Sequence, residues 1–91
     1  MKRVLIKVEG QVQGVDFRRY TVLKARELGI TGYVSNQADG SVLILAQGSH
    51  AAVNNLLLWC DTGSPLAKVT RITVEEDEAN DIYLDFSIVQ S

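Results

Sequence analysis

The sequence predicts an α+β fold, in which a mostly antiparallel sheet carries two helices on one of its faces. Three observations lead to this expectation. Apolar residues alternate along several short segments, two longer segments carry them at helical spacing, and glycines separate many of these segments. The chain has 91 residues, which is the length of one domain, so we expect a single domain over residues 1–91.

The first part of the chain predicts a strand followed by a helix. Residues 3–8 alternate with a period of two, which indicates a strand. Gly29 is expected to end the helix, because glycine readily adopts the left-handed conformation found at helix ends. The apolar face of this helix is predicted to consist of Phe17, Thr21, Ala25 and Leu28.

A hairpin is predicted next. Residues 31–36 are rich in strand formers, and the Asp39-Gly40 pair that follows is a strong signal for a tight turn. Residues 41–47 are apolar on both faces, as expected for a strand at the centre of a sheet.

The remaining residues predict one more helix and two strands. Ser49 is expected to cap the helix, and residues 62–65 to end it. Residues 68–75 predict a strand, and the acidic residues 75–81 a solvated turn. The helix is expected to bury Val53, Leu56, Leu57 and Cys60, and the last strand to carry Ile82, Leu84, Phe86 and Ile88 on one face.

The resulting order is β-α-β-β-α-β with a short fifth strand at the C-terminal end. This is the split βαβ, or ferredoxin-like, plan. Because that fold supports many unrelated functions, the function has to be inferred from a site.

Composition narrows the classes of function. An apolar fraction of 46% and a charged fraction of 22% are typical of a globular protein. The net charge of −2 argues against nucleic acid as a partner, and no apolar run approaches the roughly 20 residues of a membrane span. We therefore expect a soluble cytoplasmic protein. One cysteine and one histidine cannot form a disulfide or a His/Cys zinc site, so we expect no metal and no cofactor.

The segment between the first strand and the first helix is a candidate anion-binding loop. Gly14 permits a positive φ and a close approach of a ligand, and successive amides then point at the positive end of the helix. Arg18 adds a planar fork of donors suited to two phosphate oxygens. The pattern alone is a weak signal, because it matches neither of the common nucleotide-binding motifs. The candidate phosphate-binding residues are Gln13, Gly14, Val15, Asp16, Phe17 and Arg18.

A second segment strengthens this interpretation. The run Gly-Tyr-Val-Ser-Asn-Gln-Ala-Asp-Gly-Ser-Val at residues 32–42 resembles the second hallmark of the acylphosphatase family, and the loop at residues 10–18 resembles the first, Gly-x-Val-Gln-Gly-Val-x-Phe-Arg. Weaker likenesses follow at matching spacing over nearly the whole chain: Leu28-Gly29, Trp59, Gly63-Ser64-Pro65 and Phe86-Ser87-Ile88.

The resemblance implies an enzyme that hydrolyses the carboxyl–phosphate bond of acyl phosphates without a metal or a covalent intermediate. It implies that Arg18 binds the phosphoryl group and that Asn36 positions the attacking water. The expected partners are a small-molecule acyl phosphate as substrate and inorganic phosphate or sulfate as product or inhibitor, with the chain acting as a monomer.

Three neighbouring residues bear on this site. Asp16 either points to solvent, or it caps the helix or restrains Arg18 at some expense in anion affinity. Ser35 stands where many relatives carry a basic residue, which predicts a less positive site. Arg19 projects about 100° from Arg18 around a helix and is expected to be a surface charge that can steer anions.

The main alternative is a non-catalytic ferredoxin-like module that binds or regulates another molecule. RNA-recognition domains share the topology but need aromatic and basic residues on a central strand. Residues 41–47 offer neither, which weakens the RNA interpretation and leaves a regulatory or protein-interaction module as the alternative.

Overall fold

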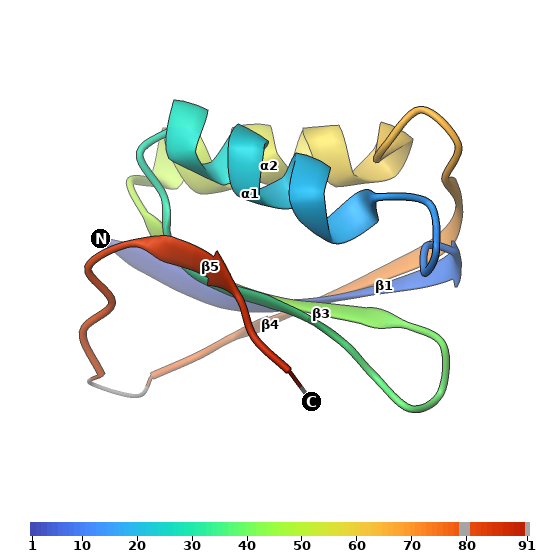
Figure 1. The fold of residues 1–91 in the computed structure, drawn as a ribbon. Coiled ribbons are helices and arrows are strands. Elements are labelled where there is room, and N and C mark those ends of the chain that lie inside the picture. The colour runs from blue at the N-terminus through green and yellow to red at the C-terminus, as the bar shows by residue number, and fades with distance from the viewer. Residues whose placement is uncertain (79–80, 91) are drawn as a thin grey trace.

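A computed structural model describes residues 1–78 and 81–90 of the chain. Their elements follow the predicted order (Figure 1). Among these residues, neither helix is long and apolar enough to cross a membrane. The elements are β1 (Lys2–Gln11), α1 (Phe17–Glu27), β2 (Thr31–Asn36), β3 (Val42–Gly48), α2 (His50–Thr62), β4 (Lys68–Glu76) and β5 (Phe86–Ile88).

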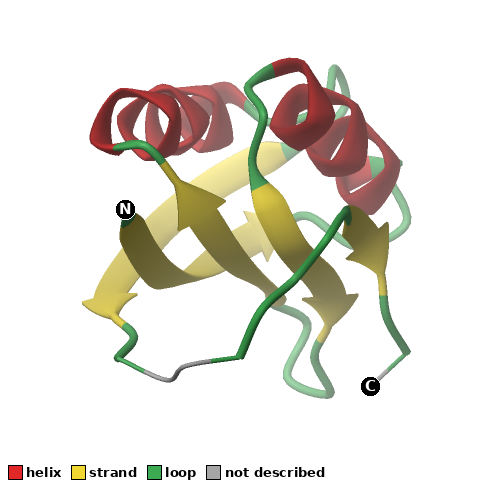
Figure 2. Cartoon of the chain, turned by 90° about the vertical axis from the view of Figure 1, so that its left-hand side faces the viewer, coloured by secondary structure: helices red, strands yellow, loops and turns green. Residues whose placement is uncertain are grey.

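The strands form a sheet in the order β4-β1-β3-β2-β5. All neighbouring pairs are antiparallel except β2 and β5, which are parallel. Both helices cover the same face of this sheet (Figures 1 and 2). The predicted fold class is therefore confirmed, as is the central place of β3, where Ile44 and Leu45 are both buried although they point to opposite faces.

The core lies between the helices and the sheet. The predicted helix faces are correct: α1 buries Phe17, Thr21 and Ala25, and α2 buries Val53, Leu56 and Cys60, while Leu28 and Leu57 are partly buried against them. Burial raises the pKa of the Cys60 thiol to about 12, which leaves it protonated and inert. The predicted start of α2 is correct, because Ser49 accepts a hydrogen bond from the amide of Ala52 at 3.1 Å. The predicted end of α1 is also correct, because Gly29 follows the helix with a left-handed φ of 73°.

The predicted last strand is wrong over its first half. Ile82 and Leu84 are 80% and 92% exposed, and β5 begins only at Phe86. The cause is topological: β4 and β5 lie at opposite edges of the sheet, so the segment between them has to cross it and cannot pair. Alternation of apolar residues records a local tendency to extend but does not supply a partner strand.

The predicted acidic turn is also only partly correct. Glu75 and Glu76 belong to β4, and Asp77 accepts a hydrogen bond from Nε of Arg3 at 2.7 Å. The pairing of β1 with β4 extends the strand into this acidic run. Residues 79 and 80 of the predicted turn lie outside the described residues.

Gly63 ends α2 at a point where a side chain has no room. Its φ is 69°, and an added Cβ would lie 2.6 Å from Cε2 of the buried Phe17 ring. Gly29 has a similar φ of 73°, but an added Cβ there would meet nothing within 4 Å. The two glycines therefore separate the cost of a left-handed backbone from that of a steric collision.

We expect Gly29→Ala to lower the free energy of unfolding by about 1 kcal/mol, the usual cost of a left-handed alanine. Gly63→Ala should cost roughly 1–3 kcal/mol more, because the Phe17 ring has to move within a packed core. Urea denaturation of both variants measures the difference. Equal losses of unfolding free energy would show that the Phe17 ring can move aside without destabilising the core.

Candidate active site

A depression of about 290 Å³ lies where β1 leads into α1. Four residues of the predicted phosphate loop line it, and so does Asn36 at the end of β2. The fold thus brings the two predicted catalytic side chains, Arg18 and Asn36, to one depression. The lining consists of Val12, Gly14, Asp16, Phe17, Arg18, Arg19, Asn36 and Ile88.

The loop turns through two residues with positive φ, Gly14 at 76° and Asp16 at 60°. Asp16 occupies the N-cap position of α1, but its side chain makes no capping hydrogen bond. Within the described residues it also forms no hydrogen bond or ion pair with Arg18. Because Asp16 is exposed and makes neither of these contacts, the structure agrees with the solvent-facing alternative and not with the capping one.

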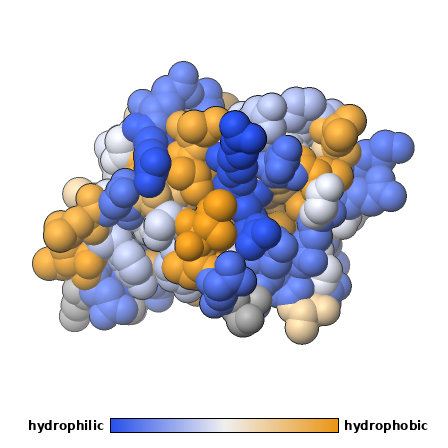
Figure 3. Space-filling model, in the orientation of Figure 1, coloured by the Kyte–Doolittle hydropathy of each residue, from blue (hydrophilic) through white to orange (hydrophobic). Residues whose placement is uncertain are grey.

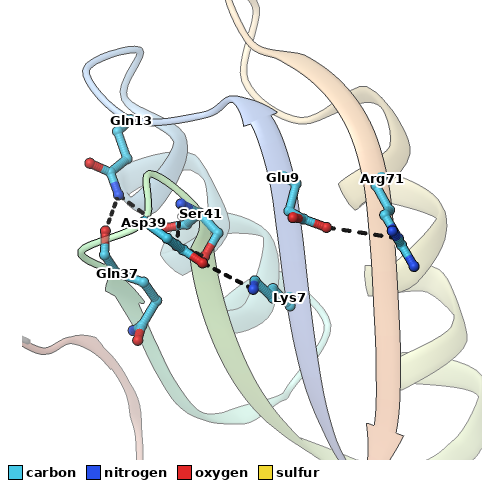
Figure 4. Close-up of polar contacts among 7 residues, drawn as sticks. All are labelled: Lys7, Glu9, Gln13, Gln37, Asp39, Ser41 and Arg71. Atoms are coloured by element: carbon cyan, nitrogen blue, oxygen red, sulfur yellow. Dashed lines mark hydrogen bonds and ion pairs between the residues drawn. The ribbon is translucent and has the colours of Figure 1, made fainter.

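Gln13 ties the loop to the β2–β3 hairpin (Figure 4). Its Nε2 donates hydrogen bonds to the carbonyls of Gln37 and Ser41, at 2.8 and 2.9 Å. Gln13 itself does not line the depression. Its side chain instead fixes the distance between the loop and the segment that directly follows Asn36.

Two further contacts fix the other side of the loop. The carbonyl of Val15 accepts a hydrogen bond of 2.7 Å from Oγ of Ser64, which follows α2. Phe17 is buried, and its ring centroid lies 5.4 Å from that of Trp59. Val15, like Gln13, does not line the depression. The loop is therefore held on both sides before any ligand binds, as efficient anion binding requires.

The hairpin has its own polar anchor (Figure 4). Oδ1 of Asp39 accepts hydrogen bonds from the amide and the hydroxyl of Ser41, at 3.0 and 2.6 Å, and Nζ of Lys7 lies 3.0 Å from Oδ2. The bonds from Ser41, followed by the contact with Lys7, hold the pKa of Asp39 well below its usual range. Asp39 is therefore ionised at neutral pH and closes the turn beyond Asn36.

Asn36 has an unusual side chain. Its Oδ1 is buried, yet no group among residues 1–78 and 81–90 donates a hydrogen bond to it. An unpaired buried acceptor typically costs about 1–3 kcal/mol. Such atoms are rare in folded proteins.

Ser35 does not lie at the depression. It is 3% exposed and, because side chains alternate along a strand, it points to the face of the sheet opposite Asn36. Its hydroxyl donates a hydrogen bond of 3.2 Å to the carbonyl of Asn36. The absence of a basic residue at this position therefore does not remove a charge from the lining.

Three lining residues were missing from the predicted site. Arg19 is exposed, as expected of a surface charge, and it also lines the depression together with Arg18. Val12 is a buried part of the floor. Ile88 arrives from β5, where its backbone pairs with Val34 of β2, and only this long-range pairing brings it to the site.

The electrostatics of the depression favour an anion. The amino end of α1 and the guanidinium groups of Arg18 and Arg19 contribute positive potential, and Asp16 opposes it with one negative charge. Phe17, which is buried, adds an aromatic group to the lining. A small, doubly charged oxyanion matches this arrangement better than a cation or a neutral ligand.

Comparison with known proteins agrees with this chemistry. The family model described as "Acylphosphatase" matches residues 4–88. Curated acylphosphatases of Shewanella amazonensis and Shewanella oneidensis are 63% and 62% identical, the first over 100% of both chains and the second over 99% of this chain and 100% of the relative. The crystal structure of acylphosphatase from Bacillus subtilis superimposes with a TM-score of 0.94 at 39% identity, covering 98% of this chain and 99% of that one.

A match to the family model over residues 4–88 and identities above 60% along the full length are decisive. The chain therefore belongs to the acylphosphatase family, the hydrolases that cleave the carboxyl–phosphate bond of acyl phosphates, as the two sequence motifs predicted.

Proposed function

We propose that the depression is the catalytic site for acyl phosphate hydrolysis, with Arg18 and the loop amides holding the phosphoryl group and Asn36 orienting the attacking water. The observation that carries this proposal is that Arg18 and Asn36, from different elements, belong to the lining of one depression at the start of α1. The same proposal assigns the whole chain to a single catalytic domain.

Binding of the phosphoryl group follows from the donors at the loop. The backbone amides of the turn and of the first residues of α1 have no hydrogen-bond partners within the helix, so they can donate to equatorial phosphate oxygens. Arg18 can pair with two of these oxygens at once. Phosphoryl transfer requires chiefly positioning and stabilisation of charge on these oxygens, which is what the arrangement offers.

Asn36 is suited to holding water because its amide both donates and accepts hydrogen bonds and does not ionise. A water held by this side-chain amide keeps an oxygen lone pair free to attack phosphorus. Attack forms the new P–O bond, and the bond to the carboxylate oxygen breaks. Both hydrogens of the water end on phosphoryl oxygens, so the products are a carboxylate and dihydrogen phosphate.

The carboxylate is a good leaving group, so no general acid is needed in this scheme. Inorganic phosphate, as product, and sulfate, as its analogue, are expected to compete for the same donors. A monomeric state, a cytoplasmic location and the lack of a nucleic-acid partner stay predictions from the sequence.

Arg18→Ala should reduce kcat/KM for benzoyl phosphate by at least about 10²–10³, comparable to removing an oxyanion donor. Phosphate release measured in EDTA tests the role of Arg18 and the independence from metal together. Arg71→Ala is the matched control, because it removes an exposed arginine from β4, outside the depression, and should retain wild-type activity. Equal turnover by both variants would overturn the assignment of Arg18, whereas no turnover by a folded wild-type chain favours the binding-module alternative.

Asn36→Ala should lower kcat more than it weakens inhibition by inorganic phosphate, because Asn36 is assigned to the water rather than to the phosphoryl group. Steady-state kinetics with phosphate as inhibitor separate the two effects. Asn54→Ala, at an exposed position of α2, controls for loss of an asparagine. A large rise in the inhibition constant with kcat retained would move Asn36 from water to phosphate binding.

Asp16 places a carboxylate beside the anion, so Asp16→Asn should tighten phosphate inhibition by roughly three- to tenfold at low ionic strength. Asparagine keeps the shape and tolerates a left-handed backbone, so the charge alone changes. The gain should shrink in 0.5 M salt if it is electrostatic. An unchanged inhibition constant at low salt means that the Asp16 carboxylate is solvated too well to act on the ligand.

A further inference from the structure

A second groove continues from the depression along α1. Its helical wall consists of residues at i, i+3, i+4 and i+7, which form one stripe on a helix. Its other wall is β5, and its volume is about 320 Å³. The groove is lined by Arg19, Val22, Leu23, Arg26, Ser87 and Ile88.

The groove and the catalytic depression share two residues, Arg19 and Ile88. Because both residues line both spaces, the groove directly adjoins the depression. A ligand held by its phosphoryl group at the start of α1 therefore has a direct path along the helix toward Arg26.

The surface along this path is largely apolar. Leu23 is 56% exposed and Ile88 is 43% exposed, and Val22 is packed partly into the core beside them. Figure 3 shows hydrophobic surface next to strongly hydrophilic surface on the face that carries α1 and β5. At the far end, Arg26 is paired with Asp85 at 3.1 Å, so this cation is already balanced.

We propose that the groove is an acyl subsite, in which Leu23, Val22 and Ile88 contact the apolar body of the substrate's acyl group. The inference rests on the proposed function of the adjoining depression. In an acyl phosphate one bridging oxygen separates phosphorus from the carbonyl carbon, so the acyl chain has to leave the depression through its rim. The expected substrates are phosphorylated aliphatic acids of about four to eight carbons and aromatic acids, in preference to acetyl phosphate.

A second copy of the chain is a weaker candidate for this groove. A stable protein interface buries about 800 Å² on each partner. Two half-exposed aliphatic side chains and a three-residue edge strand offer far less than that. The adjacency to the catalytic depression favours a small acyl group.

The test is the dependence of kcat/KM on acyl chain length, measured with acetyl, butanoyl and hexanoyl phosphate. In wild type, kcat/KM should rise about twofold for each added methylene, since full burial of a methylene gives about fourfold and the groove is open on one side. Leu23→Gln keeps the helix propensity and length of the side chain, so it should flatten this rise and leave acetyl phosphate hydrolysis unchanged.

Leu58→Gln is the matched control, because Leu58 is an exposed leucine of α2 outside both spaces, 72% exposed. It should keep the wild-type dependence on chain length. The subsite would be overturned if wild-type kcat/KM did not depend on acyl chain length, or if Leu23→Gln and Leu58→Gln changed that dependence equally. It would also be overturned if Leu23→Gln changed only the elution volume in gel filtration, as expected of a contact between two copies of the chain. Failure to hydrolyse any acyl phosphate would instead overturn the proposed function, whereas turnover with a flat profile overturns the subsite alone.

Discussion

The side-chain amide of Gln13 connects two segments on which the site depends. It donates hydrogen bonds to the carbonyls of Gln37 and Ser41 and so fixes the loop at residues 13–18 against the β2–β3 hairpin. Asn36 is the last residue of β2, directly before this hairpin turn. Arg18 and Asn36 come from different elements, and neither makes a described hydrogen bond to the other. Their separation is therefore set by the backbone, and Gln13 is the side chain that links the two backbones directly.

Other contacts also hold the loop and the segments around it in place. Ser64 holds the Val15 carbonyl from one side, and Asp39 closes the hairpin on the other. Phe17 places the first turn of α1 on the core, so the helix cannot rotate its amino end away from the depression without exposing an aromatic ring. Because these groups are already paired, the cost of ordering the loop is met by folding rather than by ligand binding. This preorganisation suits a reaction that depends on positioning.

Local patterns were sufficient to predict most of the fold, and long-range pairing explains what they could not predict. The periods of β1, α1 and α2 and the continuous apolar run of β3 reflect burial, so the sequence records them directly. Ile82 and Leu84 alternate just as well, but the chain is crossing between opposite sheet edges there and has no partner strand. Among site residues, Arg18 and Asn36 lie in recognisable motifs. Ile88 belongs to a weaker likeness near the end of the chain, but that likeness does not predict its place at the depression, which Ile88 reaches only through the parallel pairing of β5 with β2.

The proposal of one site, in which the loop and Arg18 bind phosphate beside Asn36, can be tested by NMR titration with inorganic phosphate. The backbone amide signals of residues 14–18 and the side-chain amide signal of Asn36 should shift together, with one dissociation constant. Signals of β4, at the far edge of the sheet, should stay unchanged. Separate dissociation constants for the loop and Asn36, or shifts confined to other basic residues, would contradict this proposal.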